Sequence, residues 1–564
     1  MTDKTLSARI LAPAGRLRDR LAVRRAWLGA RGAAGMNLPE PMYLGEADRG
    51  SRLVGDVWAV AGREIALAGR PIWDAVGLDP RIEPARQGFG WLDDLAALGN
   101  RPARTLAQGW TQDWIRRFGG GAGPGWEPEL AGARAMRWVA HARLLVEGAD
   151  RPAEAAFWRA LGAHQRYLAR AWPRAAAGLP RLRALAGLVW TGRALPDAGA
   201  RAAVERMGEL AEAMVGREGE LAARSPEELA RVLALLTWTA RLLEDGGSGA
   251  SAAHLGAIVR LVPTLRPLRM GDGTVARFHG GGGWDAIAID KALAELRLET
   301  QPRPRLPMGF ARLTGGRIVL VMDGAAPPGG AAAATAHAGT LGFEMSVGRQ
   351  PLVTGQGPGG AFGPPAALAS RQTRAHSTVE VDGASSAGFA GGALVAGPTL
   401  VSVRLAQDAT GMWLLATHDG YVAGKGLLHE RRIFVDARGG EARGEEILTV
   451  TDARARETYD RAARAAGGRL GFATRFHLHP DVAVVEDDPQ APLLKLPGGE
   501  AWEFRAGGGE VAVEESVWHD PAAAAPRRTR QVVVRSEVVE YLGQVTWSFL
   551  RVLDAPRAVR AEPR

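Results

Sequence analysis

The chain has 564 residues, 46% of them hydrophobic and 23% charged, which is typical of a folded globular protein long enough for more than one domain. Its net charge of +9 comes almost wholly from arginines dispersed among acidic residues, whereas a nucleic-acid-binding protein clusters its basic residues, so we expect no nucleic-acid partner. The absence of cysteine excludes disulfides and thiolate chemistry, so any metal would need His, Asp or Glu ligands.

The first 30 residues have arginines in every short apolar run and lack the apolar stretch of a signal peptide. They predict a solvated lead helix, with a surface-seeking helix as the alternative. No segment approaches the roughly 20 apolar residues of a membrane span, so we expect no integral membrane segment. Oligomeric state cannot be read from these patterns.

Apolar residues recur at helical spacing up to about residue 300. The predicted helix with the clearest start begins at Ser225. Ser225 can accept first-turn amides, Pro226 suits the first helical position, and Glu228 completes a capping box. Glycines at 246–247 end the run. The predicted buried stripe is Leu229, Val232, Leu233 and Leu236.

Most tryptophans lie in this helical part of the chain. Their flat faces could stack on sugar rings, but packing between helices is the more general role of a single tryptophan. Those concerned include Trp58, Trp73, Trp91, Trp110, Trp114, Trp138, Trp158, Trp172, Trp190 and Trp238.

The hydrophobic period changes after Glu299, where the proline-rich segment 301–307 cannot continue a helix. Short β-type runs then alternate with Gly, Pro and Asp, which favours an antiparallel sandwich. The predicted strands lie within 317–324, 399–406, 411–420, 431–440, 476–488 and 530–543. We therefore predict a multidomain α + β protein with a lead segment (1–50), a helical domain (51–300) and a β-sandwich domain (301–564).

Three segments of the β part each place one histidine among small or hydroxyl residues: 334–345, 371–383 and 415–421. An imidazole in such surroundings can act as base, acid or ligand. For His418 in the third segment, a tight turn through Asp419 and Gly420, with Tyr421 anchoring the next strand, is the favoured interpretation. For the others, a simple hydrogen bond to a backbone carbonyl is the structural alternative.

The segments AHAGTLGFEMSVG, RQTRAHSTVEVDG, HDGYVAGKGLLHERRIFVD, GEEILTV, TRFHLHPDV and ESVW…RRTRQVVV occur in this order. Together they resemble the C-terminal domain of bacterial heparinase II/III-family proteins, over roughly residues 305–550. The resemblance implies an incomplete α/α toroid before an antiparallel β-sandwich. It also implies β-elimination of a uronic-acid-containing polysaccharide, an acidic glycan partner, a location in the cell envelope and no required cofactor.

Residue by residue, the resemblance places His337 at the second histidine of an HxHxD-like motif, as general base or acid. Thr335 replaces the first histidine, and Gly339 replaces the acid. His376 falls on a segment whose histidine can ligate a structural zinc in the family. Thr354 is the nearest match for the acidic zinc partner, so a zinc ion on His376 remains an open alternative.

The helical part offers less of the expected site. Tyr43 and Tyr167 are its only tyrosines, and neither lies in a segment that matches the family's catalytic tyrosine. Arg183 stands near the expected amide position and could neutralise a substrate carboxylate, but it cannot act as a base. His279, beside the glycine run 280–283, is the second catalytic candidate, although an interdomain turn explains the glycines equally well.

Arg371 and Arg374 flank His376 and could bind a uronate or sulfate bidentately, or pair with nearby carboxylates. The leading hypothesis is a heparinase-like lyase. The alternatives are a non-catalytic glycan-binding or envelope-associated protein, favoured by the missing tyrosine, amide and zinc ligands, and a metal-dependent hydrolase. Because no signal peptide is visible, a cytoplasmic location is the alternative to the envelope.

Overall fold

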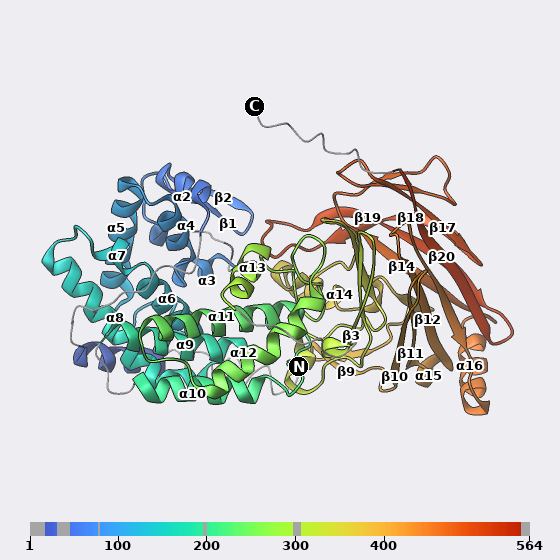
Figure 1. Ribbon diagram of the computed structural model, residues 1–564, viewed down its shortest axis with the longest axis horizontal. Helices are drawn as coiled ribbons and strands as arrows, with labels where there is room; N and C mark the ends of the chain where they lie inside the picture. Colours follow the sequence, from blue (N-terminus) through green and yellow to red (C-terminus); the bar gives the residue numbers. More distant parts are fainter. Residues whose placement is uncertain are drawn as a thin grey trace. The chain divides into compact units, whose positions relative to one another are not determined.

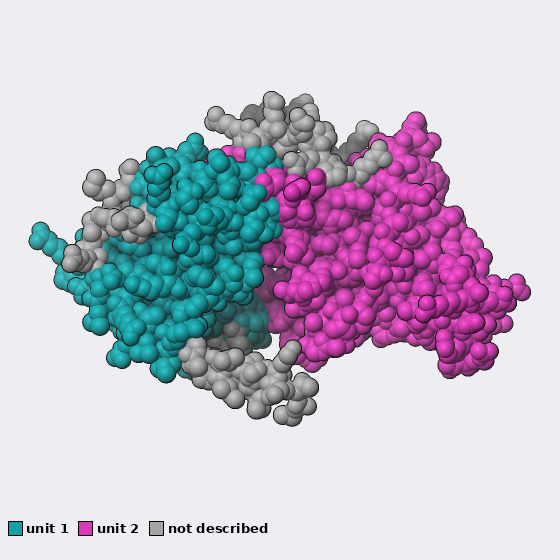
Figure 2. Space-filling view, turned by 90° about the horizontal axis from the view of Figure 1, so that it is seen from below, with its two compact units in different colours: residues 1–215, 231–259 teal, residues 216–230, 260–564 magenta. Residues whose placement is uncertain are grey.

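A computed structural model of the chain describes residues 17–30, 45–76, 79, 81–195, 200–296 and 306–553. The chain forms two compact units, coloured separately in Figure 2. Unit 1 comprises residues 1–215 and 231–259, and unit 2 comprises residues 216–230 and 260–564. The predicted domain borders after residues 50 and 300 remain predictions. Within the described residues, no helix combines the length and hydropathy needed to cross a membrane.

Unit 1 is built mainly of helices (Figure 1), as the apolar spacing predicts. A hairpin of β1 (Val57–Val60) and β2 (Arg63–Ala66) accompanies them. The helices are α2 (Ala47–Val54), α3 (Ile82–Gln87), α4 (Gly90–Leu98), α5 (Arg101–Phe118), α6 (Pro128–Ala140), α7 (Ala142–Val146), α8 (Arg151–Ala171), α9 (Leu179–Ala194) and α10 (Ala200–Met214). Helices α11 (Pro226–Asp245) and α12 (Ala252–Leu265) have residues in both units.

Helix α11 begins and ends where the sequence predicts. The Ser225 hydroxyl accepts the backbone N–H of Glu228 at 3.4 Å, and the helix ends at Asp245, immediately before Gly246. The predicted stripe is fully buried, at Leu229, Val232, Leu233 and Leu236. Local capping and apolar spacing thus suffice to define this element.

The tryptophans of unit 1 pack in its interior, as predicted. Trp114 and Trp138 meet edge to face, with ring centroids 5.4 Å apart. Of the ten rings considered, Trp172 is half-buried and the other nine are buried. These nine are therefore core residues of the folded helices.

Helices α6 and α9 approach each other closely at two glycines. A Cβ atom on Gly187 would lie 2.4 Å from the Cα of Gly132, closer than any real contact. Only glycine at these positions lets the two backbones come so near.

Unit 2 contains two large antiparallel sheets (Figure 1), which confirms the predicted sheet type. The first sheet has the order β10-β11-β12-β13-β20-β17-β16-β15. Its strands are β10 (Val401–Gln407), β11 (Gly411–Tyr421), β12 (Leu427–Asp436), β13 (Glu441–Thr449), β15 (Ala483–Val485), β16 (Leu493–Lys495), β17 (Ala501–Gly507) and β20 (Leu542–Leu553).

The second sheet has the order β18-β19-β14-β6-β5-β4-β3, with β7 also paired to β14. Its strands are β3 (Phe310–Gly315), β4 (Ile318–Asp323), β5 (Phe343–Val347), β6 (Gln350–Thr354), β7 (Val379–Val381), β14 (Leu470–Leu478), β18 (Glu510–Trp518) and β19 (Arg527–Val538). A separate hairpin joins β8 (Gly388–Ala390) and β9 (Ala393–Ala396), and the helices of this unit include α13 (Ala286–Ala294), α14 (Pro364–Ala369), α15 (Val422–Lys425) and α16 (Ala453–Ala465).

One apolar core joins the two sheets. Phe343 of the second sheet stacks on Trp547 of the first at 5.6 Å, and Phe476 meets Phe549 at 5.5 Å. These rings belong to a single cluster of buried side chains drawn from both sheets. The arrangement is a β-sandwich.

The predicted tight turn at His418 is only partly right. Strand β11 continues through Asp419 and Gly420 to Tyr421, with an irregularity in its pairing to β12 between His418 and Tyr421. His418 is buried and directly opposite His429. Cross-strand pairing thus overrides the local turn signal, whereas Tyr421 does anchor the region, since its hydroxyl donates to the carbonyl oxygen of Val379 at 2.7 Å.

Candidate functional site

Unit 2 brings the three histidines of the predicted site into one cluster. His337 follows a short 3-10 helix (Gly330–Ala334), and His376 follows another (Thr373–Ala375). His279 lies in the glycine-rich loop before α13 and has a left-handed backbone (φ 48°), which is uncommon outside glycine. All three side chains are buried, with exposures of only 2–3%.

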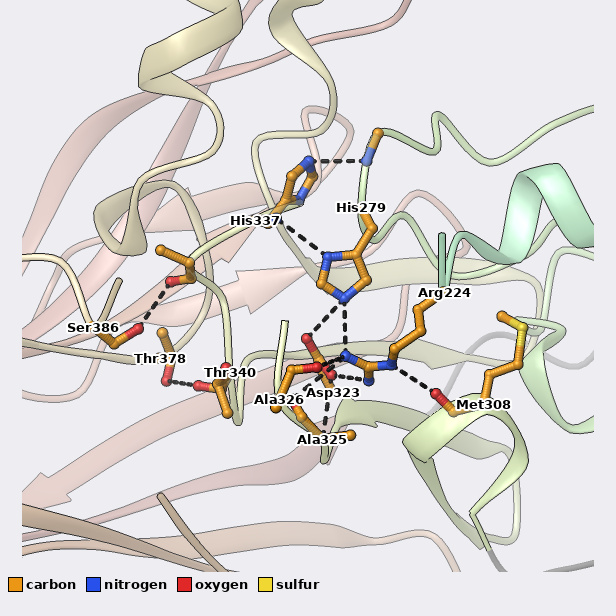
Figure 3. Close-up of polar contacts among 12 residues, drawn as sticks. Arg224, His279, Met308, Asp323, Ala325, Ala326, His337, Thr340, Thr378 and Ser386 are labelled. Carbon is orange, nitrogen blue, oxygen red and sulfur yellow. Dashed lines mark hydrogen bonds and ion pairs between the residues drawn. The ribbon is translucent and has the colours of Figure 1, made fainter. Parts of the chain in front are cut away.

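His279 and His337 are joined by two reciprocal hydrogen bonds (Figure 3). The backbone N–H of Gly280 donates to Nε2 of His337 at 2.9 Å. The backbone N–H of His337 donates to Nδ1 of His279 at 3.2 Å. Each ring thus accepts a hydrogen bond from a backbone N–H at, or directly after, the other histidine. We call this pair of hydrogen bonds the histidine clasp.

The His279 ring of the clasp also contacts a buried carboxylate, Asp323, at the end of β4. Nε2 of His279 lies 3.1 Å from Oδ2 of Asp323, and Arg224 forms an ion pair with the same carboxylate. Arg224 also donates to the carbonyl oxygens of Met308 and Ala326, each at 2.8 Å. Asp323 therefore ties the loop before α11 to the loop before α13 (Figure 3).

The hydrogen bonds define which ring nitrogens carry protons. Because Nδ1 of His279 accepts an amide, its proton is on Nε2, which lies 3.1 Å from Oδ2 of Asp323. Because Nε2 of His337 accepts an amide, its proton is on Nδ1, which has no hydrogen-bond partner among the residues described. Both rings are therefore neutral in this arrangement.

The pKa directions agree with neutral rings. Burial lowers the pKa of His279, and neighbouring Asp323 only partly opposes this effect. Burial, then the nearby His376, hold the pKa of His337 well below its usual value. Burial alone would raise the pKa of Asp323, but Arg224 and His279 outweigh it and hold that pKa at about 2.

These contacts restrict the chemistry of the cluster. A general base needs a lone pair that faces the proton it removes. In the clasp, the one available lone pair of each histidine accepts a backbone amide. The buried N–H at Nδ1 of His337 is the one group of the clasp that could still act, as a hydrogen-bond donor.

His376 stacks on His337, with ring centroids 4.9 Å apart. Its ring fills the space beside Gly339, where the family resemblance expects an acid. A Cβ atom on Gly339 would lie 2.9 Å from Cγ and Cδ2 of His376. Burial lowers the pKa of His376 to about 3, so this ring is also neutral.

The metal alternative depends on several ligands meeting at one point. Across the described residues, no group of three or more His, Asp or Glu side chains is placed to hold a metal ion. Thr354, the nearest match to the acidic zinc partner, is buried on β6, and its backbone carbonyl accepts the Ser377 hydroxyl at 2.7 Å. The Thr354 hydroxyl and Nε2 of His376 are each buried without a hydrogen-bond partner among the described residues.

The two arginines beside His376 already have partners in the fold. Arg371 donates to three backbone carbonyl oxygens at 2.5–2.8 Å and lies 5.0 Å from the ring of Phe389. Arg374 pairs with Glu380 at 2.9 Å. Their predicted role in substrate binding stays a prediction that would require these contacts to change.

In unit 1, the remaining predicted residues also make internal contacts. Arg183 forms an ion pair with Glu129. Tyr167 is buried, and its hydroxyl donates to the carbonyl oxygen of Trp126. Burial raises the pKa of Tyr167 well above its usual value, and Tyr43 lies outside the described residues. Neither the arginine nor this tyrosine presents a free reactive group.

Sequence reasoning missed Asp323 and Arg224. Asp323 was part of a predicted strand that ends in a turn, and Arg224 directly precedes the Ser225 cap. Each residue could therefore be explained by its local position, as part of a turn or as the residue before a helix cap, without a role in the site. The only signal was the presence of a charged residue at the end of an apolar strand, where burial demands a partner.

A second buried chain runs through the first sheet. The backbone N–H of Gly420 donates to Nδ1 of His418 (3.0 Å), His418 contacts His429 (3.0 Å), and His429 contacts Glu446 (2.8 Å). Arg431 donates to Glu446 at 2.8 Å. His429 and Arg431 lie on the same strand, β12, and their hydrogen bonds to Glu446 form a buried core network.

Comparison with known proteins connects this geometry to a family. Residues 301–548 match the family model described as "Heparinase II/III-like, C-terminal". The chain is 30% identical over 497 residues to FtsZ-localized protein C of Caulobacter vibrioides (strain NA1000 / CB15N), covering 85% of this chain and 83% of that protein.

Solved lyase structures share the fold. Heparinase III has a TM-score of 0.69 at 11% identity, covering 94% of this chain and 89% of the other. Heparan sulfate lyase HepC of Pedobacter heparinus has a TM-score of 0.54 at 12% identity, covering 95% and 88%. Chondroitin AC lyase of Streptomyces coelicolor A3, solved with chondroitin sulphate, has a TM-score of 0.50 at 14% identity, covering 96% and 83%. The likeness includes the helical part and the sandwich, so the fold is the toroid plus β-sandwich.

Proposed function

Because this chain belongs to the heparinase II/III-like family, we propose that it is a binding protein that keeps the polysaccharide-lyase fold, does not cleave glycans, and associates with FtsZ. The observation that carries the non-catalytic part is the histidine clasp. Both candidate catalytic rings use their lone pairs to accept backbone amides. A fold shared with lyases does not by itself supply their chemistry.

The clasp is costly to open for catalysis. Freeing His337 leaves the Gly280 amide without its acceptor, and each buried polar group left unpaired costs about 1–3 kcal/mol. Freeing His279 breaks its link to the His337 amide in the same way. A base that must break such bonds before each turnover is poorly arranged for β-elimination.

The association with FtsZ is proposed from the curated relative. FtsZ-localized protein C resembles this chain over most of the length of both proteins. The neutral, locked histidines agree with a role in which the fold acts as a binding surface. This role would place the protein at the division apparatus of the cell.

The absence of lyase activity can be tested by absorbance. β-Elimination creates an unsaturated uronate that absorbs at about 232 nm, so the purified chain should give no increase with heparan sulfate, chondroitin sulfate or alginate. An active heparinase III serves as the positive control. A steady absorbance increase that scales with protein concentration would contradict the non-catalytic proposal.

The FtsZ association can be tested by sedimentation. The full chain should pellet with FtsZ polymers assembled with GTP and stay in the supernatant with FtsZ kept in GDP. A chain that stays in the supernatant under both conditions argues against direct association. The two assays are independent, so each part of the proposal can fail alone.

The second candidate is a lyase acting on an acidic glycan, and one observation favours it. Nδ1 of His337 is a buried donor with no partner among the described side and main chains, so it could donate a hydrogen bond to a leaving oxygen. In this candidate, Asp323 orients His279 as the base after the clasp opens. Arg371, Arg374 and Arg183 would bind uronate carboxylates after leaving their present partners.

If the absorbance assay detects activity, His337→Ala should lower kcat at least about a hundredfold, the usual effect of losing a hydrogen-bond donor to the charge that develops in the transition state. His479→Gln is the matched control, because His479 lies beyond the end of β14 and takes no part in the clasp. Equal activity of both variants would remove His337 from the mechanism.

A further inference from the structure

The β8–β9 hairpin of unit 2 forms a small sheet of its own. Within the described residues, β8 and β9 pair with each other and with neither large sheet. Each of residues 388–396 is exposed or half-buried. An isolated two-stranded hairpin is only marginally stable in water, so contacts outside the hairpin must hold it in place.

Both ends of the hairpin are fixed to the sandwich. Before β8, the Ser385 hydroxyl accepts the backbone N–H of Thr373 at 3.1 Å, and the backbone N–H of Ser386 donates to the Thr373 hydroxyl at 2.8 Å. After β9, the Asp419 carboxylate accepts the backbone N–H of Thr399 at 2.8 Å. The ends are therefore anchored, and the tip is the part that can move.

Arg371 holds the tip of the hairpin. The tip is formed by Gly391 and Gly392, both with left-handed backbones (φ 57° and 81°). Nη1 of Arg371 donates to the carbonyl oxygen of Gly392 at 2.5 Å. The guanidinium also lies 5.0 Å from the ring of Phe389, which β8 contributes.

The same guanidinium reaches the segment that leads to His337. Nε of Arg371 donates to the carbonyl oxygen of Ala336 at 2.8 Å, and Nη2 donates to that of Ala333 at 2.7 Å. Strand β9 lies beside the 3-10 helix Gly330–Ala334 of this segment. Because a guanidinium carries its donors in a fixed planar fork, one side chain can join two segments in this way.

Closure of the hairpin places a cation among neutral groups. The Arg371 residue is only 9% exposed, and these three partners are carbonyl oxygens rather than carboxylates. Burial lowers the pKa of Arg371, because desolvation disfavours the charged form. When the tip lifts, water can solvate the guanidinium again, which offsets part of the hydrogen bonding and stacking that is lost.

We propose that residues 388–396 form a strap that closes on Arg371 and opens about its anchored ends, exposing the Arg371 guanidinium beside the His337 segment. In the closed strap, the Gly392 carbonyl and the Phe389 ring occupy positions that a ligand of Arg371 would need, so the strap is an autoinhibitory contact. Opening leaves the clasp intact, because neither of its hydrogen bonds involves Arg371 or the strap. The proposal depends neither on the association with FtsZ nor on lyase activity.

Hydrogen exchange of the full chain, read by mass spectrometry, tests whether the strap opens. Its amides should exchange at least about a hundredfold faster than those of the core strand β14. Phe389→Ala removes the stacked ring but leaves the links of Arg371 to Ala333 and Ala336, and should speed exchange of the strap at least about threefold. Phe118→Ala, which removes another half-buried ring in unit 1, is the matched control and should leave exchange of the strap unchanged.

Modification by phenylglyoxal, which attacks accessible guanidinium groups, tests whether opening exposes Arg371. In the wild type, Arg371 should react at least about tenfold more slowly than the exposed Arg404. Phe389→Ala should speed the reaction of Arg371 at least about threefold and leave that of Arg404 unchanged. Peptide mapping of the modified chain assigns each reaction to its arginine.

Three results would overturn the proposal. Strap amides that are as protected as those of β14 would show that the strap does not open. Unchanged exchange in Phe389→Ala would show that the contact with Arg371 does not hold it, and faster exchange without faster modification of Arg371 would show that opening exposes no guanidinium. Phe389 is half-buried, so its variant should fold, and thermal unfolding checks this. Because no lyase or FtsZ assay is involved, failure here leaves the proposed function standing.

Discussion

At the scale of single residues, Asp323 is the group on which most of the candidate site depends. Its buried carboxylate holds both Arg224 and His279. Asp323→Asn leaves these two donors facing a neutral amide, so we expect a loss of about 3 kcal/mol in the free energy of unfolding, measured with urea. Most of this loss arises because the largely buried Arg224 guanidinium is left without a carboxylate, in addition to the attraction that is lost.

The matched control is Glu537→Gln, which removes a carboxylate from an exposed pair with Arg469. This change should shift the unfolding free energy by less than about 0.5 kcal/mol. Similar losses in the two variants would show that the Asp323 pair is no more important than a surface ion pair.

The buried histidines predict a loss of stability in mild acid. Burial lowers the pKa of His376 to about 3 and that of His477 to about 4, whereas an unfolded histidine titrates near about 6.5. Below that pH the unfolded chain binds more protons than the folded chain, so the free energy of unfolding falls as pH falls. Each such histidine should cost about 2 kcal/mol at pH 5 relative to pH 8.

Urea unfolding across this range measures the effect. His376→Gln should reduce the slope of the unfolding free energy against pH by up to the contribution of one proton. Asp94, whose pKa burial raises to about 6, acts in the opposite direction and reduces the total slope. Identical slopes in wild type and His376→Gln would mean that this ring titrates normally in the folded protein.

At the scale of elements, the contact of α6 with α9 gives a test of helix packing. Gly187→Ala places a methyl group against the Gly132 backbone, so we expect a loss of about 1–3 kcal/mol from overpacking. Gly109→Ala in α5 is the control, since a Cβ there meets nothing within 4 Å. It should stabilise the protein by about 0.5–1 kcal/mol through helix propensity, and equal effects in urea unfolding would contradict this packing.

Elements with local determinants were predictable from the sequence. The start of α11 follows from Ser225 and Pro226, and the strands of unit 2 follow from short β-type runs. The turn predicted at Asp419 and Gly420 was wrong in part, because pairing of β11 with β12 carries the strand through it. Local turn chemistry competes with cross-strand pairing, and the outcome depends on residues outside the segment.

The site was predictable only as a set of histidines. The sequence singled out His279 and His337, but they are 58 positions apart in the chain and meet only in the fold. Arg224 and Asp323, 99 positions apart, complete the group. Which nitrogen of a ring carries the proton depends on a backbone amide from a distant segment, and no residue pattern encodes that orientation.

At the scale of the whole molecule, metal dependence is testable. No cluster of three or more suitable ligands occurs in the part of the chain that the structure describes. We therefore expect EDTA treatment to leave Tm unchanged and metal analysis of the purified chain to find less than a stoichiometric amount. A clear fall in Tm with EDTA, reversed by zinc, would restore the metal alternative.

The whole fold persists at an identity of only 11% to heparinase III. The apolar core that joins the sheets needs only residues of suitable size and period, so it tolerates wide substitution. A catalytic site needs particular groups in particular places. Fold and chemistry can therefore diverge within one family.

The contact between Gly339 and His376 also limits how this chain could evolve. An aspartate at position 339, which the family motif would place there, has to displace a buried aromatic ring that itself stacks on His337. No single substitution at that position restores the motif while the ring stays where it is. Placing an aspartate at position 339 therefore requires at least two coordinated changes, one at that position and one that moves or replaces His376.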